Sequence, residues 1–250
     1  MKSIPASNLT MKTLNVFVIS WAGQNENAVA IASEISNGPH EVTIVYSDDN
    51  PEFKPTTSCR VLKRPNDLFW ADKFKGCLEA CTSDLMMVIH ADCTCKDWSE
   101  LVARGYEAAS TMPNGGVWAP IIEGTPWPLT RTELVTLNHT PISIVAQTDA
   151  LVFCITKPLI ERMRSANYDK NLHGWGIDWM LISHAYATGR LAVVDRSVVV
   201  KHPYTERGYK ESIAQAQMDE FLGQLTLNEF VQYTLLRSHV NRLEPKILES

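Results

Sequence analysis

A histidine and an aspartate end the most apolar segment of the sequence, SDLMMVIHAD, in which one residue separates His90 from Asp92. Alternate side chains of a strand point to the same face, so these two could converge on one metal ion. An imidazole beside a carboxylate suits Mn²⁺ or a similar divalent ion better than Ca²⁺, which prefers oxygen ligands alone. The alternative is a carboxylate that caps the turn before the next helix, with a hydrogen-bonded histidine beside it. The motif alone leaves both interpretations open.

The segment GWGIDW, from Gly174 to Trp179, is a second candidate. Glycines let the backbone approach a ligand closely and let a loop move. Asp178 would lie at or near the start of a helix, where the macrodipole favours an ionised carboxylate. Such a carboxylate beside a cleft can act as a general base. Equally, Asp178 could be a helix cap flanked by tryptophans of the core.

The third candidate is His202, which directly follows an apolar run in VVVKHP and precedes a proline. Taken alone, a single histidine can be a metal ligand or a structural side chain. Its position matters because ligands of open α/β sheets bind at the carboxyl ends of the strands. The acids Asp48 and Asp49 end an earlier apolar run, so the rule predicts them on the same rim as His90 and Asp92.

These residues need a sheet to position them, and the chain alternates short apolar runs with amphipathic segments. That alternation is typical of strands covered on both faces by helices, which predicts an α/β fold. Strands are predicted at 15–20, 40–49, 59–64, 83–92 and 115–120, and helices at 25–36, 68–80 and 97–110.

The pattern changes after residue 115. Residues 120–142 hold four prolines and few periodic signals, which predicts a long excursion over the surface. Beyond it we expect two short strands, or one bent strand, and then a helix opened by Pro158, a favoured first-turn residue. The remaining predictions are a helix that follows GWG and ends at Gly189, a final strand pair in 191–203, and a mainly helical tail over 212–248.

Composition excludes several classes of protein. Apolar residues make up 45% of the 250 residues and charged residues 20%, which is too apolar for disorder and ordinary for one globular domain. The net charge of -5 argues against a chain that mainly binds polyanions. No segment approaches the roughly 20 apolar residues that cross a bilayer, so we expect a cytoplasmic protein.

Two further groups of residues have side chains that could bind a metal or a polyanion. The six cysteines are too sparse for a disulfide scaffold, and Cys77 and Cys81 share a predicted helical face that favours core packing over metal binding. A basic cluster in the tail could face a polyanion, although a solvated helix face is the ordinary interpretation. The cluster comprises Arg237, His239, Arg242 and Lys246.

Together, the motifs resemble the GT-A class of nucleotide-sugar glycosyltransferases, in particular family 2-like enzymes, over roughly residues 14–205. In that class an apolar strand ends in an Asp-any-Asp motif that binds a divalent metal and the donor diphosphate, and VIHAD occupies this place. GWGIDW is similar to the loop that supplies the catalytic base of inverting members, and GWG followed by an acid is also similar to the β-1,4-galactosyltransferase group. The resemblance implies a mixed, mostly parallel Rossmann-like sheet, with a helical extension over about 206–250.

The resemblance implies a role for each matching residue. Asp92 would bind the metal or diphosphate, with His202 as a second ligand and His90 as a less certain one, and Asp178 would deprotonate the acceptor. Mn²⁺ is favoured over Mg²⁺, because histidine replaces the first aspartate of the motif and the site loses a negative charge. The donor, expected to be a UDP-sugar, would meet Asp48 or Asp49, Lys73, Asp149, Trp175 and Gly176, with Trp21 to Asn25 as a wall of the nucleotide pocket.

The departures from the family pattern keep other functions open. Besides His90, isoleucine stands in GWGIDW where many relatives carry a glutamate. A catalytically inactive nucleotide-sugar-binding module is therefore one alternative. A sugar nucleotidyltransferase is another, although SWAGQNENA lacks the basic, glycine-rich phosphate loop that such enzymes carry. The acceptor stays open between glycans, lipids, proteins and modified nucleic-acid bases, because acceptor loops vary on one scaffold.

Overall fold

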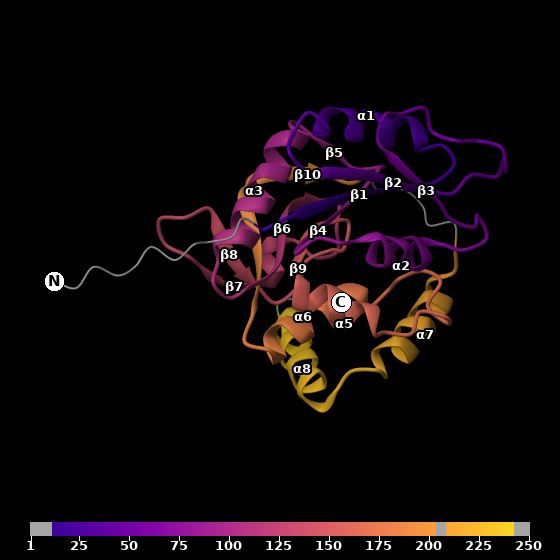
Figure 1. Cartoon of the computed structure of the whole chain (residues 1–250). Coiled ribbons are helices and arrows are strands. Elements are labelled where there is room, and N and C mark those ends of the chain that lie inside the picture. Colours follow the sequence, from indigo (N-terminus) through magenta and orange to yellow (C-terminus); the bar gives the residue numbers. More distant parts are fainter. Residues whose placement is uncertain (1–11, 204–208, 243–250) are drawn as a thin grey trace, which may run out of the picture.

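The computed structural model describes residues 12–203 and 209–242, which form one mixed sheet flanked by helices (Figure 1). The strands are β1 Leu14–Ser20, β2 Glu41–Tyr46, β3 Arg60–Lys63, β4 Leu85–His90, β5 Thr94–Cys95, β6 Gly115–Glu123, β7 Glu133–Thr136, β8 Ile142–Val145, β9 Val152–Thr156 and β10 Leu191–Lys201. The helices are α1 Asn25–Ile35, α2 Trp70–Ala80, α3 Trp98–Thr111, α4 Leu129–Thr132, α5 Lys157–Arg164, α6 Ile177–Ala187, α7 Glu211–Leu222 and α8 Leu227–Arg242.

The strand order is β3-β2-β1-β4-β9-β6-β10-β8-β7, and β5 pairs with β10 away from this path. Strands β3, β2, β1 and β4 are parallel, β6 is parallel to β10, and the antiparallel strand β9 separates the two groups. The predicted α/β class, with a central, mostly parallel sheet flanked by helices, is confirmed. This order brings the ends of β1, β2 and β4 to one edge.

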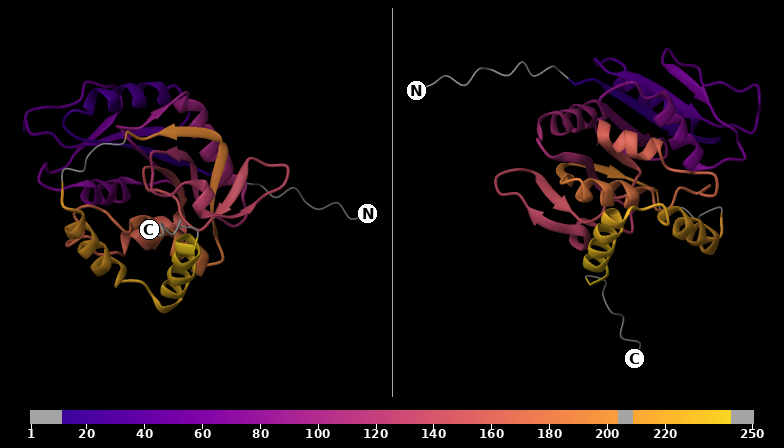
Figure 2. Two further views of the ribbon diagram at one scale, coloured as in Figure 1. Left: turned by 180° about the vertical axis from the view of Figure 1, so that it is seen from behind. Right: turned by 60° about the horizontal axis from the view of Figure 1, so that its bottom comes forward.

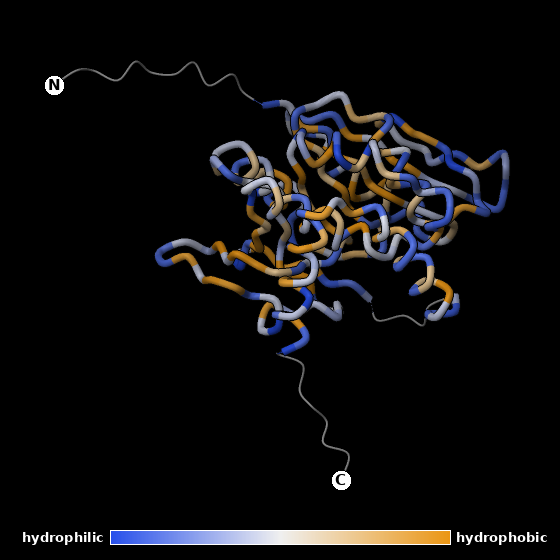
Figure 3. The backbone as a smooth tube through the Cα atoms, turned by 90° about the horizontal axis from the view of Figure 1, so that it is seen from below, coloured by the Kyte–Doolittle hydropathy of each residue, from blue (hydrophilic) through white to orange (hydrophobic). Residues whose placement is uncertain are grey.

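Helices cover both faces of the sheet. Successive side chains of a strand point to opposite faces, so each strand contributes to the core on either side. In β1, Val16 and Val18 pack on the side of α1 and α3, whereas Phe17 and Ile19 pack on the side of α2, α5 and α6. Figure 1 shows these two helical layers above and below the sheet. Seen from below, the hydrophobic segments gather in the middle of the molecule and hydrophilic loops surround them (Figure 3).

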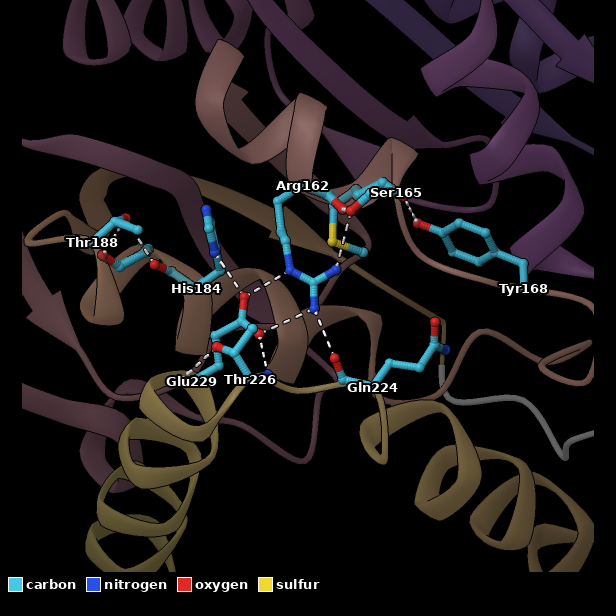
Figure 4. A network of polar contacts seen from close by, with 10 residues as sticks. Arg162, Ser165, Tyr168, His184, Thr188, Gln224, Thr226 and Glu229 are labelled. Atoms are coloured by element: carbon cyan, nitrogen blue, oxygen red, sulfur yellow. Dashed lines mark hydrogen bonds and ion pairs between the residues drawn. The ribbon is translucent and has the colours of Figure 1, made fainter.

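The C-terminal helix is fixed to the body by a buried carboxylate (Figure 4). Glu229 of α8 is 1% exposed, and its oxygens accept hydrogen bonds from Arg162 Nε at 2.7 Å and Arg162 Nη2 at 3.0 Å. His184 Nδ1 lies 2.7 Å from Glu229 Oε1. Burial acts to raise the pKa of Glu229, but hydrogen bonds from Arg162, the Thr226 amide and His184 outweigh it and lower the pKa to about 2. This contact joins α8 to α5 and α6.

Several predicted elements are corrected by the structure. The segment 120–142 is not one irregular excursion: β6 continues to Glu123, α4 follows, and β7 pairs with β8 in a hairpin. The predicted final strand pair is the single strand β10, whose pairing with β6 shifts register between Asp195 and Val199. The short strand β5 was not predicted. Two strands separated by 146–151 do occur in 142–156. The tail is helical as far as Arg242, and Lys246 lies outside the described residues.

Candidate active site

Asp92 and His202 meet at the carboxyl end of the sheet. His202 Nε2 lies 3.2 Å from Asp92 Oδ2, although β4 and β10 are not neighbours in the sheet order. The short strand β5 explains the contact, because Thr94 pairs with Lys201 and Cys95 with Val200 in antiparallel register. Continuing this register by one residue sets His202 opposite Cys93, so Asp92, one residue further along, comes within reach of the imidazole.

The two side chains stabilise each other's charged form. The hydrogen bond with Asp92 raises the pKa of His202 against the lowering effect of burial. Burial in turn acts to raise the pKa of Asp92, but the hydrogen bond from His202 and the charges of His90 and His202 outweigh it, so the pKa lies below its ordinary value. A carboxylate that stays ionised in a partly buried corner suits a cation or a hydrogen-bond donor.

His90 lies beside this pair, but inside an aromatic cage. Its ring packs against Trp21, with centroids 6.1 Å apart, and against Trp70 of α2 at 5.5 Å. Nε2 of His90 is buried and has no hydrogen-bond partner. Burial lowers the pKa of His90 to about 4, so the imidazole is neutral at pH 7 and its unpaired nitrogen can face a ligand.

The donor set fits a metal that completes its shell with ligand oxygens. Among residues 12–203 and 209–242, no group of three His, Cys, Asp or Glu side chains is close enough to hold an ion. Asp92 and His202 nevertheless offer one carboxylate and one imidazole in contact, and His90 adds the unpaired buried nitrogen. Divalent ions in phosphate-handling sites are commonly held by one or two protein side chains together with substrate phosphates.

The GWG loop enters α6 against two helices. Gly174 lies so close to Trp70 that an added Cβ would come within 2.1 Å of the indole, and its φ is +78°. Gly176 precedes α6 with φ +86°, and an added Cβ would come within 3.0 Å of Met218 and 3.3 Å of Leu222 of α7. Both positions need glycine, because L side chains rarely adopt this conformation. Trp175 between them donates Nε1–H to the Tyr209 hydroxyl at 3.0 Å.

Asp178 is in the first turn of α6. Its Oδ2 accepts a hydrogen bond from Gln147 Nε2 at 2.7 Å, and its Oδ1 accepts one from the Trp179 amide at 2.8 Å. Burial raises the pKa of Asp178 to about 7, with a further contribution from the negative charge of Asp149, against the lowering effect of backbone amides. A carboxylate with a pKa near neutrality is well suited to take up and return a proton at pH 7.

Asp149 lies within electrostatic range of both Asp178 and His202. It lines a small pocket together with Asp178, and it accepts a hydrogen bond from Thr125 Oγ1 at 2.7 Å. Its charge contributes to the raised pKa of Asp178 and, after the larger effects of Asp92 and burial, to the raised pKa of His202, which lies outside the lining of this pocket. Residues far apart in the chain thus share one electrostatic environment.

The carboxyl ends of β1 and β2 carry a chain of polar contacts. Ser20 Oγ donates to Asn25 Oδ1 at 2.7 Å, and Asn25 Nδ2 donates to Asp48 Oδ2 at 2.7 Å. Asp48 therefore has a fixed orientation at the strand end. Asp49 is more exposed and accepts a hydrogen bond from Asn66. The structure brings Asp48 and Trp21 to the same rim as Asp92, as the sheet rule predicts.

Lys73 is placed differently from a phosphate-facing lysine. Its side chain is buried at 4% exposure, and Nζ donates to the carbonyls of Leu68 at 3.0 Å and Phe69 at 3.5 Å. Burial lowers the pKa of Lys73 to about 8. Its charge still reaches His90, because it contributes to the lowered pKa of that imidazole. A direct phosphate contact would require Nζ to leave these carbonyls.

Sequence reasoning missed three residues that support this site. Trp70 contacts His90 and Gly174, Gln147 holds Asp178, and Thr125 holds Asp149. Trp70 and Gln147 carry no local signal, since each is an ordinary residue of a helix start or a loop. Thr125 lies in the segment predicted as a surface excursion.

Comparison with known proteins identifies the fold. No family model and no curated protein sequence matches the chain. Among solved structures, it is similar to a mannosyltransferase from Pyrobaculum calidifontis in complex with GDP-Man and Mn²⁺, with a TM-score of 0.58, 11% identity, and coverage of 92% of this chain and 70% of that one. GalNAc-T7 with UDP, GalNAc and Mn²⁺ matches with a TM-score of 0.63 and 10% identity over 93% of this chain. The chain spans about half, 52%, of that protein.

A UDP-glucose pyrophosphorylase complexed with UDP-glucose also matches, with a TM-score of 0.50, 11% identity, and coverage of 85% of this chain and all of that one. Identities this low relate folds and not activities. No helix of the described residues is long and apolar enough to cross a membrane. The sheet order, the flanking helices and these similarities together show that the chain has the GT-A fold of nucleotide-sugar glycosyltransferases.

Proposed function

We propose that this chain is a glycosyltransferase that moves a sugar from a nucleoside-diphosphate donor, with a UDP-sugar favoured, to an acceptor hydroxyl. One observation carries the proposal: Asp149 lines a pocket with Asp178 and acts electrostatically on both Asp178 and His202. Asp178 and the acidic, histidine-bearing corner of Asp92 and His202 therefore lie within electrostatic range of one carboxylate. Groups placed in this way suit a reaction in which a hydroxyl loses a proton while a diphosphate departs.

The diphosphate end is assigned to the sheet corner. Asp92 and His202 would hold a divalent metal, Mn²⁺ in preference to Mg²⁺, because an imidazole ligand suits the softer ion. When bound, the metal neutralises the charge that develops on the departing diphosphate. The neutral, caged His90 is assigned to the border of this site, where its unpaired nitrogen can contact either the metal or a donor oxygen.

The acceptor end is assigned to the start of α6. Asp178 takes the proton of the attacking hydroxyl, and Gln147 orients the carboxylate for this step. Because the pKa of Asp178 is near 7, a large fraction of the carboxyl group is ionised at neutral pH and can accept a proton. With Asp178 assigned as the base and the neighbouring carboxylate of Asp149 assigned to the sugar, no residue is assigned as a nucleophile, so we propose inversion at the anomeric carbon. A product with the anomeric configuration of the donor would contradict this part of the proposal.

The remaining donor contacts follow from placement on the rim. Asp48, held by Asn25, is assigned to the nucleoside together with Asp49, and Trp21 forms a wall of the pocket. Asp149 and the loop residues Trp175 and Gly176 are assigned to the sugar. Lys73 is assigned to the diphosphate only if its ammonium leaves the carbonyls that it contacts here.

The test is a panel of UDP- and GDP-sugars with Mn²⁺, Mg²⁺ or EDTA, read by thermal shift for binding and by nucleoside-diphosphate release for turnover. A donor that binds stabilises the fold by mass action. We expect Asp92→Asn to lose the metal-dependent shift. Asp178→Asn should keep the shift and lose turnover by on the order of 10²-fold or more. Asp219→Asn, an exposed aspartate of α7, is the matched control and should change neither.

The outcomes separate the alternatives. A donor-dependent shift without release or transfer from any donor would identify an inactive nucleotide-sugar-binding module. Release of pyrophosphate from a nucleoside triphosphate and a sugar 1-phosphate would identify a nucleotidyltransferase, the class of the similar pyrophosphorylase. Turnover unchanged in Asp178→Asn would remove the assigned base.

A further inference from the structure

Helix α8 exposes an apolar stripe that its buried contacts leave uncovered. Its inner face packs on the body through Tyr233, Leu236 and Val240, which are at most 8% exposed. On the outer side, four large apolar side chains recur at helical spacing: Leu227 is 78% exposed, Phe230 53%, Val231 46% and Leu235 61%. Half of the exposed large apolar side chains of the described residues are on this one helix. Figures 1 and 2 show α8 at the outer edge of the molecule.

The charges on α8 are of one sign at its surface. The helix LNEFVQYTLLRSHVNR contains one acid, Glu229, and this carboxylate is buried against Arg162. Arg237 and Arg242 are exposed on the second half of the helix. Although the whole chain has a net charge of -5, the surface of α8 therefore combines an apolar first half with a cationic second half.

We propose that the outer face of α8 binds the surface of an anionic phospholipid bilayer. A helix with large apolar side chains on one side and basic side chains nearby lies in the membrane interface, and its binding combines apolar burial with attraction to anionic headgroups. This inference is independent of the proposed function. The apolar stripe argues against a nucleic acid as the polyanion, because phosphate backbones are bound through basic and polar groups.

A second copy of the chain is the weaker candidate for the same face. A stable protein interface buries about 800 Å² and roughly 20–30 residues on each partner, and α8 offers four apolar side chains over little more than two turns. A bilayer needs no matching partner surface, so a short stripe suffices for reversible binding.

The test is flotation of the full chain with sonicated vesicles of phosphatidylcholine alone or mixed with phosphatidylglycerol. We expect binding to the mixed vesicles, weak binding to phosphatidylcholine, and loss of binding at high salt. Replacing Leu227, Val231 and Leu235 together by glutamine should lower the partition coefficient by on the order of tenfold or more. Arg242→Gln should lower it by roughly fivefold on the anionic vesicles.

The matched control replaces Val135 and Val199 by glutamine, since these are 51% and 38% exposed on other elements. It should bind like the original chain. All variants change exposed side chains, and an unchanged melting temperature verifies that each is folded. No flotation with anionic vesicles, or equal loss in the control, overturns the proposal. A concentration-dependent dimer in gel filtration that the α8 triple variant alone abolishes would assign the face to a second copy and overturn it as well.

Discussion

Replacing Asp178 by asparagine is expected to stabilise the protein at neutral pH while it removes the proposed base. Burial raises the pKa of Asp178 from 3.8 to about 7 in the folded chain. Between these values the folded state binds a proton that the unfolded state has released, so the stability of the original chain falls as pH rises and levels off above about 7. Asparagine carries no charge and escapes this loss.

The expected change in the free energy of unfolding follows from the pKa shift of Asp178 and from the loss of one hydrogen bond. One pKa unit is worth about 1.4 kcal/mol. Relative to a side chain that does not titrate, Asp178 therefore lowers the free energy of unfolding by roughly 4 kcal/mol at pH 8 and by under 2 kcal/mol at pH 5. Asparagine can keep the bond from Gln147 or the bond from the Trp179 amide, but not both, which loses about 1 kcal/mol. The expected net gain for Asp178→Asn is therefore about 3 kcal/mol at pH 8 and below about 1 kcal/mol at pH 5.

Urea unfolding followed by tryptophan fluorescence at pH 5, 6, 7 and 8 measures this difference. The control Asp219→Asn changes a carboxylate on an exposed position of α7 and should stay within about 0.5 kcal/mol of the original chain. A stability gain for Asp178→Asn that is the same at every pH, or a loss that grows with pH, would refute the argument that desolvation opposes ionisation of this carboxyl group in the first turn of α6.

Three further predictions rest on the same structure. In the free protein, kcat/KM for the proposed transfer should rise with pH through an apparent pKa near 7. In Gln147→Leu this step should move to higher pH, because the carboxylate loses a hydrogen bond that favours its ionised form; a pH–rate profile measures both. Gly174→Ala should destabilise the fold by about 1–3 kcal/mol, because its Cβ would meet Trp70 at a φ of +78°; urea unfolding checks this, and an unchanged midpoint would contradict it. Glu229→Gln should cost roughly 3 kcal/mol at pH 7, because it leaves Arg162 buried without its anion. That cost should shrink as pH falls from 4.5 towards 2, the window in which Glu229 of the original chain itself becomes protonated.

The local patterns of the sequence sufficed for the elements that carry the site. The apolar runs of β1 and β4 and the glycines before α6 are properties of neighbouring residues, and the structure confirms the strands and the helix predicted from them. The same patterns failed where pairing partners lie far away. The single strand β10 depends on pairing with β6 and β8, and the hairpin of β7 and β8 joins the sheet only through the pairing of β8 with β10, which periodicity does not report.

The sequence by itself determined which residues could do chemistry and that strand ends would collect them on one rim. It placed Asp92 after β4 and Asp178 at a helix start, because these positions follow from local apolar runs and turn residues. Only the tertiary structure decided their neighbours. The pairing of β5 with β10 brings His202 to Asp92, the packing of α2 encloses His90 with Trp70, and the fold turns Lys73 towards backbone carbonyls. Each depends on side chains from segments far apart in the chain, so burial, charge and pKa at the site follow from packing that no single segment encodes.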